Sequence, residues 1–188
     1  MPWKNGGGST TELAVFPAGA GLDDFVWRLS RAEICRDGPF SFFPGIDRSL
    51  ALLSGDGLVL QDDSTATSMR VGGAPHVFAG ERAVHAHLLE SAVVDLNIMT
   101  RRSHCVHQLH RLAVGEHVLA ATAAEQLLLY CVSGELLLAA SEPAECSLSS
   151  GDVCLLTPSA AGLKQRCQVA QTAQAWLIRL HFFKQGES

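Results

Sequence analysis

Short apolar segments recur along the chain, and each is bounded by Gly, Pro, Asp or Ser. Examples are LAVF, SLALLSG, GLVLQ, VVDLNIM, LLLYCVSG and AWLIRLHFF. Such short, punctuated segments are typical of β-strands, whereas an amphipathic helix repeats its apolar positions about every 3.6 residues. The pattern therefore predicts a mostly β fold with few short helices. Only the alanine-rich stretch AATAAEQ, within residues 112–126, fits a helical turn.

Alternation along one segment, FVWRLS, predicts two different strand faces. Phe25, Trp27 and Leu29 share one face, and Arg28 and Ser30 share the other. The second face therefore carries a cation and a hydroxyl group.

Two turns indicate an internal repeat. The segments SLALLSG and LVLQ meet at Asp56-Gly57, a dipeptide that predicts a tight hairpin. The stretch LLSGDGLVL around Gly55 resembles YCVSGELLL around Gly134, which predicts two half-chains of similar design, residues 1–102 and 103–188. The second half resembles a cupin barrel, so we expect an all-β, bicupin-like double β-barrel of the jelly-roll type. The alternative is an ordinary β-sandwich, because its hairpins also have an apolar strand, a glycine, a polar residue and a second apolar strand in this order.

The metal ligands of a cupin are mostly missing. Cupins usually hold a metal through an HxH pair, a nearby Glu and a later His. The second half has no His in VLAATAAE before Gln126 or in SAAGLKQ after Pro158. In the first half, His85 and His87 imitate the HxH pair, but Glu90 comes one residue too soon and would face away from them. We expect no metal and no cofactor. The alternative is a metal-dependent cupin enzyme that uses His85, His87 and Glu90.

Composition limits the partners. Of the 188 residues, 47% are apolar and 18% charged, so the chain can bury a sizeable core. A net charge of −5 argues against a nucleic-acid partner. No apolar run approaches the roughly 20 residues of a membrane helix, so we expect no membrane partner and a cytoplasmic location. The six cysteines form no CxxC pair, and we expect them to be reduced and packed in apolar segments.

The opening MPWKNGGGST is the most specific motif. Three consecutive glycines lose much backbone entropy on ordering, so an ordered triplet indicates a path that admits no side chain. Lys4 and Asn5 before it suggest an edge that recognises a polar group. A floppy amino terminus is the alternative.

Together with WRLSRAEI, GPFSFFPGIDRSL and VVDLNIMTRR, this opening resembles the HutD family, also called the Ves family, of small bicupin-like proteins. The resemblance covers about residues 1–102, and the remainder matches only in its β pattern and its Gly-Asp turn. Members usually carry a short segment, expected to form a strand, before the block in which Met1 lies here.

The resemblance implies a metal-free, bicupin-like protein that is associated with histidine utilisation and binds a pathway intermediate such as N-formylglutamate. No established catalytic activity comes with it. We therefore expect a small-molecule binding protein that senses or buffers an acidic intermediate of histidine catabolism. Edge strands of a double barrel can also pair, so a homodimer is a further expectation.

A small dicarboxylate needs cations, and the family-like blocks contain several. The guanidinium group grips a carboxylate in a bidentate manner, and amide side chains can hydrogen-bond a formyl group. The candidate ligand-binding residues are Lys4, Asn5, Arg28, Ser30, Arg48, Asn97 and Arg101. Alternatively, each arginine lies at the solvent-exposed rim of the fold or forms an ion pair with Asp47, Asp95 or Glu33.

Overall fold

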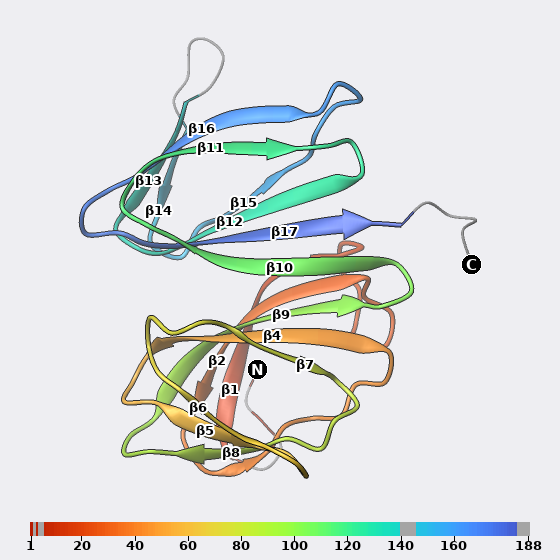
Figure 1. The fold of residues 1–188 in the computed structure, drawn as a ribbon, viewed down its shortest axis with the longest axis vertical. Helices are drawn as coiled ribbons and strands as arrows, with labels where there is room; N and C mark the ends of the chain where they lie inside the picture. Colours follow the sequence, from red (N-terminus) through yellow and green to blue (C-terminus); the bar gives the residue numbers. More distant parts are fainter. Residues whose placement is uncertain (2, 4–5, 140–145, 184–188) are drawn as a thin grey trace. The chain divides into compact units, whose positions relative to one another are not determined.

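A computed structural model describes residues 1, 3, 6–139 and 146–183 of the chain (Figure 1). These residues form seventeen β-strands and the connections between them, without a helix. The described ranges accordingly contain no helix that could span a lipid bilayer. The AATAAEQ stretch forms a tight turn rather than a helical one, because Glu125 closes it with hydrogen bonds from the backbone and hydroxyl of Thr122.

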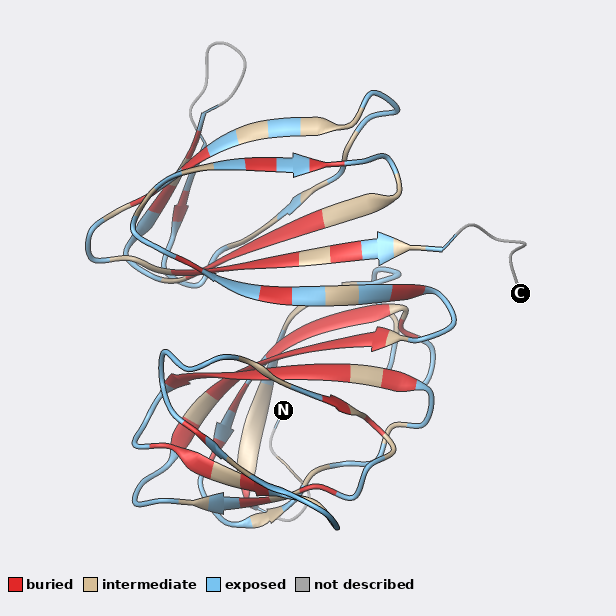
Figure 2. Ribbon diagram, in the orientation of Figure 1, coloured by how far each residue is buried: buried red, intermediate tan, exposed pale blue. Residues whose placement is uncertain are grey.

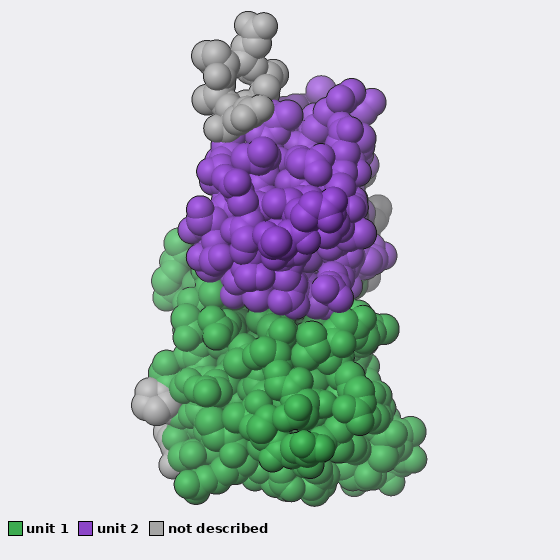
Figure 3. Space-filling model, turned by 90° about the vertical axis from the view of Figure 1, so that its left-hand side faces the viewer, with its two compact units in different colours: residues 1–106 green, residues 107–188 purple. Residues whose placement is uncertain are grey.

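The chain divides into two compact units, Met1–Val106 and His107–Ser188 (Figure 3). Unit 1 contains the strands β1 (Gly8–Phe16), β2 (Trp27–Ile34), β3 (Gly38–Pro39), β4 (Ile46–Ser54), β5 (Leu58–Gln61), β6 (Ala66–Met69), β7 (His76–Ala79), β8 (His85–Leu88) and β9 (Val93–Arg101). β10 (Cys105–Leu112) begins at the boundary. It is followed by β11 (Gly115–Ala121), β12 (Glu125–Ser133), β13 (Glu135–Ala139), β14 (Cys146–Ser149), β15 (Val153–Leu156), β16 (Leu163–Val169) and β17 (Gln174–Phe182).

Each set of strands forms two sheets. Unit 1 has the sheets β1-β2-β9-β4-β7 and β3-β8-β5-β6, and the second set has β10-β17-β12-β15 and β11-β16-β13-β14. With β1 set aside, the two halves connect their strands in the same order, which is that of a jelly roll. The sheets of each half do not close into one barrel. The predicted all-β fold of two jelly-roll halves is confirmed.

The glycines of the predicted repeat occupy matching places. Gly55 follows β4 and Gly134 follows β12, and after each the chain passes into the other sheet. Both glycines have positive φ, +98° and +78°. A Cβ on Gly55 would lie 2.6 Å from the backbone oxygen of Ala92, and one on Gly134 would lie 2.7 Å from the Cα of Ala173. The chain therefore requires glycine at both points where it passes between the sheets.

The predicted hairpin at Asp56-Gly57 is wrong. β4 pairs with β7 and β9, whereas β5 pairs with β6 and β8 in the other sheet. The dipeptide does make a sharp turn, with Gly57 at φ +126°. It leads from one sheet to the other because both edges of β4 are occupied, one by β9 and one by β7.

The cores lie between the sheets of each unit. In unit 1, Leu50 and Leu52 of β4 pack with Leu58 and Leu60 of β5, from the opposite sheet. A second, wholly separate cluster in unit 2 includes Leu127 and residues from both of its sheets. Figure 2 shows that β4 and β9 are buried along most of their length. We call the space between the two sheets of unit 1 its interior.

All six cysteines are free. Cys105, Cys131 and Cys167 are buried as expected, but Cys35 and Cys146 are exposed. Burial raises the pKa of the Cys105 thiol to about 12, so this group remains a thiol at neutral pH.

Candidate functional site

Polar side chains lie at the centre of the five-stranded sheet of unit 1. Arg28 on β2 and Arg48 on β4 lie opposite the same residue of β9, Met99. Two residues along, Ser30 lies opposite Asn97. Residues that face each other across a ladder share a sheet face, and so do alternate residues of a strand. Five side chains therefore gather on one face, and we call them the inner polar cluster: Arg28, Ser30, Arg48, Asp95 and Asn97.

The inner polar cluster faces the interior of unit 1. Leu50 and Leu52 alternate with outward residues of β4 and share the face of Arg48, and both belong to the core between the sheets. The exposed fraction of Arg28 is 7%, that of Arg48 is 3%, and that of Asn97 is 8%. Ser30 and Asp95 are each 1% exposed. Burial of so many polar groups is costly unless each finds a partner.

Arg48 is a buried cation held by aromatic rings. Its Cζ lies 5.0 Å from the ring centroid of Phe40, 5.6 Å from that of Phe43 and 4.9 Å from that of Phe78. Its Nη1 donates a long hydrogen bond of 3.4 Å to the backbone oxygen of Ser41, while its buried Nε has no partner. Burial lowers the pKa of Arg48 to about 10, so it stays charged at neutral pH. The rings stabilise that charge only in part.

Asp95 lies on β9 and is fully buried. Burial raises the pKa of its carboxyl to about 7, and the charge of Arg48 and the Ala32 backbone N–H oppose that rise. Its Oδ1 has no hydrogen-bond partner, and neither has the Oδ1 of Asn97. No ion pair within 4 Å joins Asp95 to Arg48, although both side chains are fully described. The sequence analysis missed Asp95 as part of the site and considered it only as an ion-pair partner.

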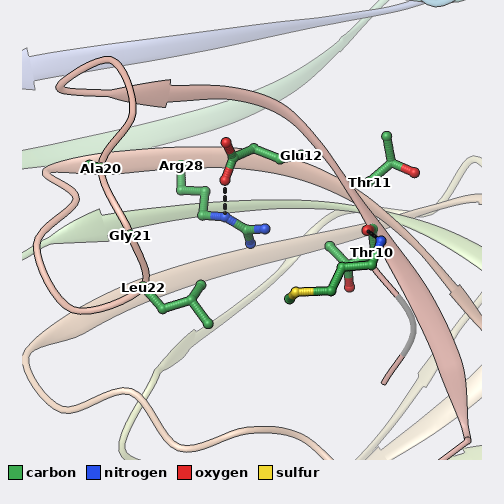
Figure 4. A pocket seen from close by; sticks show the side chains of 8 residues that line it. Thr10, Thr11, Glu12, Ala20, Gly21, Leu22 and Arg28 are labelled. Carbon is green, nitrogen blue, oxygen red and sulfur yellow. Dashed lines mark hydrogen bonds and ion pairs between the residues drawn. The ribbon is translucent and has the colours of Figure 1, made fainter. Parts of the chain in front are cut away.

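Arg28 connects the inner polar cluster with a pocket. Its Nε lies 2.8 Å from Oε2 of Glu12, in an ion pair on β1 and β2 (Figure 4). A pocket of about 440 Å³ is lined by Thr10, Glu12 and Arg28, together with Met1 and the loop residues 20–22. Arg28 is close enough to Arg48 for its charge to lower the pKa of Arg48. Arg28 is therefore the member of the cluster that also lines this pocket.

The structure places the other predicted site residues elsewhere. Arg101 lies on β9, but its Nε and Nη2 donate to the backbone oxygens of Phe25 and Asp23, at 3.0 Å and 2.7 Å. This arginine holds the loop before β2 and does not join the cluster. Lys4 and Asn5 lie outside the described residues.

The expected path of the glycine triplet is seen at Gly8. A Cβ there would collide with the backbone oxygen of Glu33. Trp3 packs against the core of unit 1, and its Nε1 donates to Oγ1 of Thr10 at 2.8 Å. At Trp3 and Gly8, therefore, the opening motif is ordered against unit 1 instead of forming a loose end.

The candidate metal ligands of the first half lie on the outer face of their sheet. The rings of His85 and His87 stack with centroids 4.6 Å apart, so alternation is confirmed. The residues between and after them, Ala86 and Leu88, pack against the core. His87 meets Asp37 at 3.1 Å. Among the described residues, no group of three or more His, Cys, Asp or Glu side chains could hold a metal ion. The interior, with two arginines, does not fit the metal that cupins usually hold.

Known proteins resemble this chain over most of its length. The model of the HutD family matches residues 1–177. Protein Ves of Citrobacter koseri is 42% identical over 104 residues, which cover 55% of this chain and 53% of the relative. An uncharacterized 21.2 kDa protein in the hutC 3′ region of Pseudomonas putida is 42% identical over 99 residues, or 53% and 52%. The chain thus spans about half the length of these two curated relatives.

Solved structures extend the comparison to the whole chain. HutD from Pseudomonas fluorescens SBW25 has a TM-score of 0.82 and 30% identity, covering 98% of this chain and 94% of that one. A conserved protein of unknown function from Pseudomonas aeruginosa PAO1 has a TM-score of 0.75 and 30% identity, covering 98% and 93%. A cupin 2 conserved barrel domain protein from Leptotrichia buccalis, only 10% identical, has a TM-score of 0.59 over 93% and 88%, and shows the shared fold alone. The chain belongs to the HutD family, as its opening motif and family-like blocks predicted.

Proposed function

We propose that unit 1 binds a small organic acid in its interior, at the inner polar cluster. The chain would then be a metal-free binding protein that senses or buffers an acidic intermediate of histidine catabolism, such as N-formylglutamate. The link to histidine utilisation rests on the family and on the relative in the hutC 3′ region. The observation that carries the proposal is the buried, charged and incompletely paired guanidinium of Arg48.

A buried cation without a carboxylate partner is costly. Removing an ion from water costs several kcal/mol in real proteins, and an opposite charge with good geometry offsets that cost. Arg48 has three aromatic rings and one long hydrogen bond to a backbone oxygen. The charge of Asp95 acts on Arg48 without an ion pair, whereas a ligand carboxylate would meet the planar guanidinium directly with two hydrogen bonds.

Arg28 supplies the second cation. Its present partner, Glu12, has a half-exposed side chain and lines the pocket. A ligand carboxylate entering by the pocket would replace Glu12 on the guanidinium, which keeps the arginine paired throughout. One strand, β9, lies between β2 and β4, so two inter-strand spacings place the backbones that carry the two arginines about 10 Å apart. Because both side chains are long and extend into the interior, each guanidinium can meet one of the two carboxylates of a small dicarboxylate.

Titration calorimetry tests this proposal. Wild-type protein is titrated with N-formylglutamate, urocanate, histidine and glutamate, and we expect at least one acid to bind with micromolar affinity, about −8 kcal/mol. Arg48→Leu should weaken that binding at least about tenfold, because each charge-assisted hydrogen bond contributes roughly 1.5–3 kcal/mol.

The matched control is Arg166→Ala. The Arg166 side chain is 72% exposed and pairs with the exposed Glu116, so the control removes the same charge at the surface. We expect its affinity to equal that of the wild type. Absence of binding by all four compounds to folded protein, or equal affinity of wild type and Arg48→Leu, would contradict the proposal.

A further inference from the structure

The inner polar cluster holds two acceptor oxygens that no donor satisfies. They are Oδ1 of Asp95 and Oδ1 of Asn97, and their residues are 1% and 8% exposed. Asp95 and Asn97 are alternate residues of β9, so their side chains leave the same face of the sheet as neighbours. About nine in ten buried polar groups in proteins are hydrogen-bonded, so a neighbouring pair without donors needs an explanation.

Neighbouring side chains do not supply the donors. Across the ladders, Asp95 lies between Ala32 and Leu52, and neither side chain carries an N–H or O–H group. Asn97 lies between Ser30 and Leu50, and no hydrogen bond joins it to Ser30. Arg48 influences Asp95 by its charge but makes no ion pair with it. No neighbouring donor reaches these oxygens, not even the buried Nε of Arg48, which has no partner of its own, and a donor brought by a ligand would satisfy them.

An acid that offers only carboxylates cannot satisfy these oxygens. Ionised carboxylates are acceptors, and they would be repelled by Asp95 while they pair with Arg28 and Arg48. A ligand with an N–H group can instead donate to the acceptors on β9 and still place its carboxylates on the arginines. The cluster has both halves of that pattern, cations on β2 and β4 and acceptors on the strand between them.

We propose that the acid bound by unit 1 carries an N–H donor beside its carboxylates, and that Asp95 and Asn97 select for it. This inference rests on the proposed function. It narrows the class of ligand to dicarboxylates with an acylated or free amino group and excludes dicarboxylates without one. Asp95 and Asn97 then determine specificity, while Arg28 and Arg48 provide most of the charge attraction.

The test compares three ligands by calorimetry at pH 8, where Asp95 is mostly ionised. N-formylglutamate has the N–H donor, N-formyl-N-methylglutamate has a methyl group in its place, and glutarate lacks the nitrogen and is smaller. We expect N-formylglutamate to bind at least about tenfold more tightly than either, because hydrogen bonds to charged acceptors are the strong ones. Glutarate controls for the bulk of the added methyl group.

Two variants assign the preference to these residues. Asp95→Ala should reduce the preference for N-formylglutamate over glutarate at least about fivefold, and glutarate should bind as tightly as before or more tightly, because the carboxylate that repels it is gone. Asn97→Leu should reduce it less, since its acceptor is neutral, and it serves as the test if Asp95→Ala does not fold. Equal binding of the three ligands to wild type, or a preference that survives both variants, would overturn the inference and leave the proposed function intact. Failure of all three ligands to bind would overturn the proposed function itself.

Discussion

Units 1 and 2 share one fold but have opposite interiors. Aligned on Gly55 and Gly134, Arg48 of β4 corresponds to Leu127 of β12. Leu127 is fully buried in the apolar core of unit 2, whereas Arg48 is a buried cation. The same strand order therefore accommodates either a charged or an aliphatic residue at this position.

The partner strands show the same contrast. In unit 1, Asn97 and Asp95 of β9 lie opposite β4. In unit 2, Leu177 and Ala175 of β17 lie opposite the matching positions of β12. Unit 2 therefore shows that the fold does not require polar side chains at these positions. We expect their presence in unit 1 to lower stability, and the ligand binding that we propose would account for it.

The largest effect is expected from giving unit 2 the charge of unit 1. Leu127→Arg would bury a guanidinium opposite Leu156 and Arg179, without the three aromatic rings that surround Arg48. Arg179 already pairs with Glu125, so the new cation would meet a like charge and no free carboxylate. We expect the free energy of unfolding to fall by about 4 kcal/mol or more, because an unpaired charge is buried. Urea denaturation followed by circular dichroism measures it. A loss below about 1 kcal/mol would show that unit 2 tolerates polar groups as unit 1 does.

The next effect is a dependence of stability on pH that arises in unit 1. The pKa of Asp95 is about 7 in the folded chain and about 4 in the unfolded one. Between these values the folded state binds the extra proton, so the free energy of unfolding should decrease as the pH rises from about 4 to about 7, and then level off. The decrease should reach up to roughly 4 kcal/mol.

Asp95→Asn isolates this contribution, since all other titrating groups are shared. The difference in unfolding free energy between wild type and Asp95→Asn is measured by urea denaturation at pH 5, 6, 7 and 8. We expect wild type to lose stability relative to the variant across this range. A constant difference would mean that Asp95 is not a desolvated carboxyl.

A third experiment converts the interior of unit 1 to that of unit 2. The triple variant Arg48→Leu, Asp95→Ala, Asn97→Leu carries the residues of the matching positions in β12 and β17. Replacement of buried polar groups by apolar ones is often neutral or stabilises a protein by about 1–4 kcal/mol. We expect a melting temperature equal to or above that of wild type, with no binding of N-formylglutamate. A strongly destabilised triple variant would show that the polar groups hold the fold together.

The smallest effect is expected at the entrance of the pocket. Glu12→Gln removes the carboxylate that competes with a ligand for Arg28 and leaves the shape of the side chain unchanged. Because Glu12 is partly exposed, its attraction is screened by water, and the affinity for N-formylglutamate should rise only about two- to fivefold. Calorimetry at low salt measures this rise. Weaker binding would mean that Glu12 itself contacts the ligand.

Much of this arrangement follows from local sequence patterns. Alternation in FVWRLS put Arg28 and Ser30 on one face, and β2 places both inside unit 1. The similarity between the sequences around Gly55 and Gly134 identified the two matching points at which the chain passes from one sheet to the other. Both predictions depend only on strand periodicity and on the backbone freedom of glycine, which neighbouring residues determine.

Long-range pairing could not be predicted in the same way. The turn at Asp56-Gly57 looks like a hairpin locally, but β9 and β7 occupy both edges of β4 and prevent one. Arg101 shares a face with Asn97, but it lies at the end of β9, where loop carbonyl groups are within reach. Asp95 lies within a strand, and the sequence around it does not indicate that it belongs to the site. Its importance arises from burial between strands that are distant in sequence.

A crystal structure of the full chain with N-formylglutamate tests the central claim most directly. We predict electron density for one molecule in the interior of unit 1, with its carboxylates on Arg28 and Arg48 and its N–H group directed at Asp95. Density in unit 2 or on the surface, with the inner polar cluster unchanged, would contradict the account, as would a metal ion coordinated by His85 and His87.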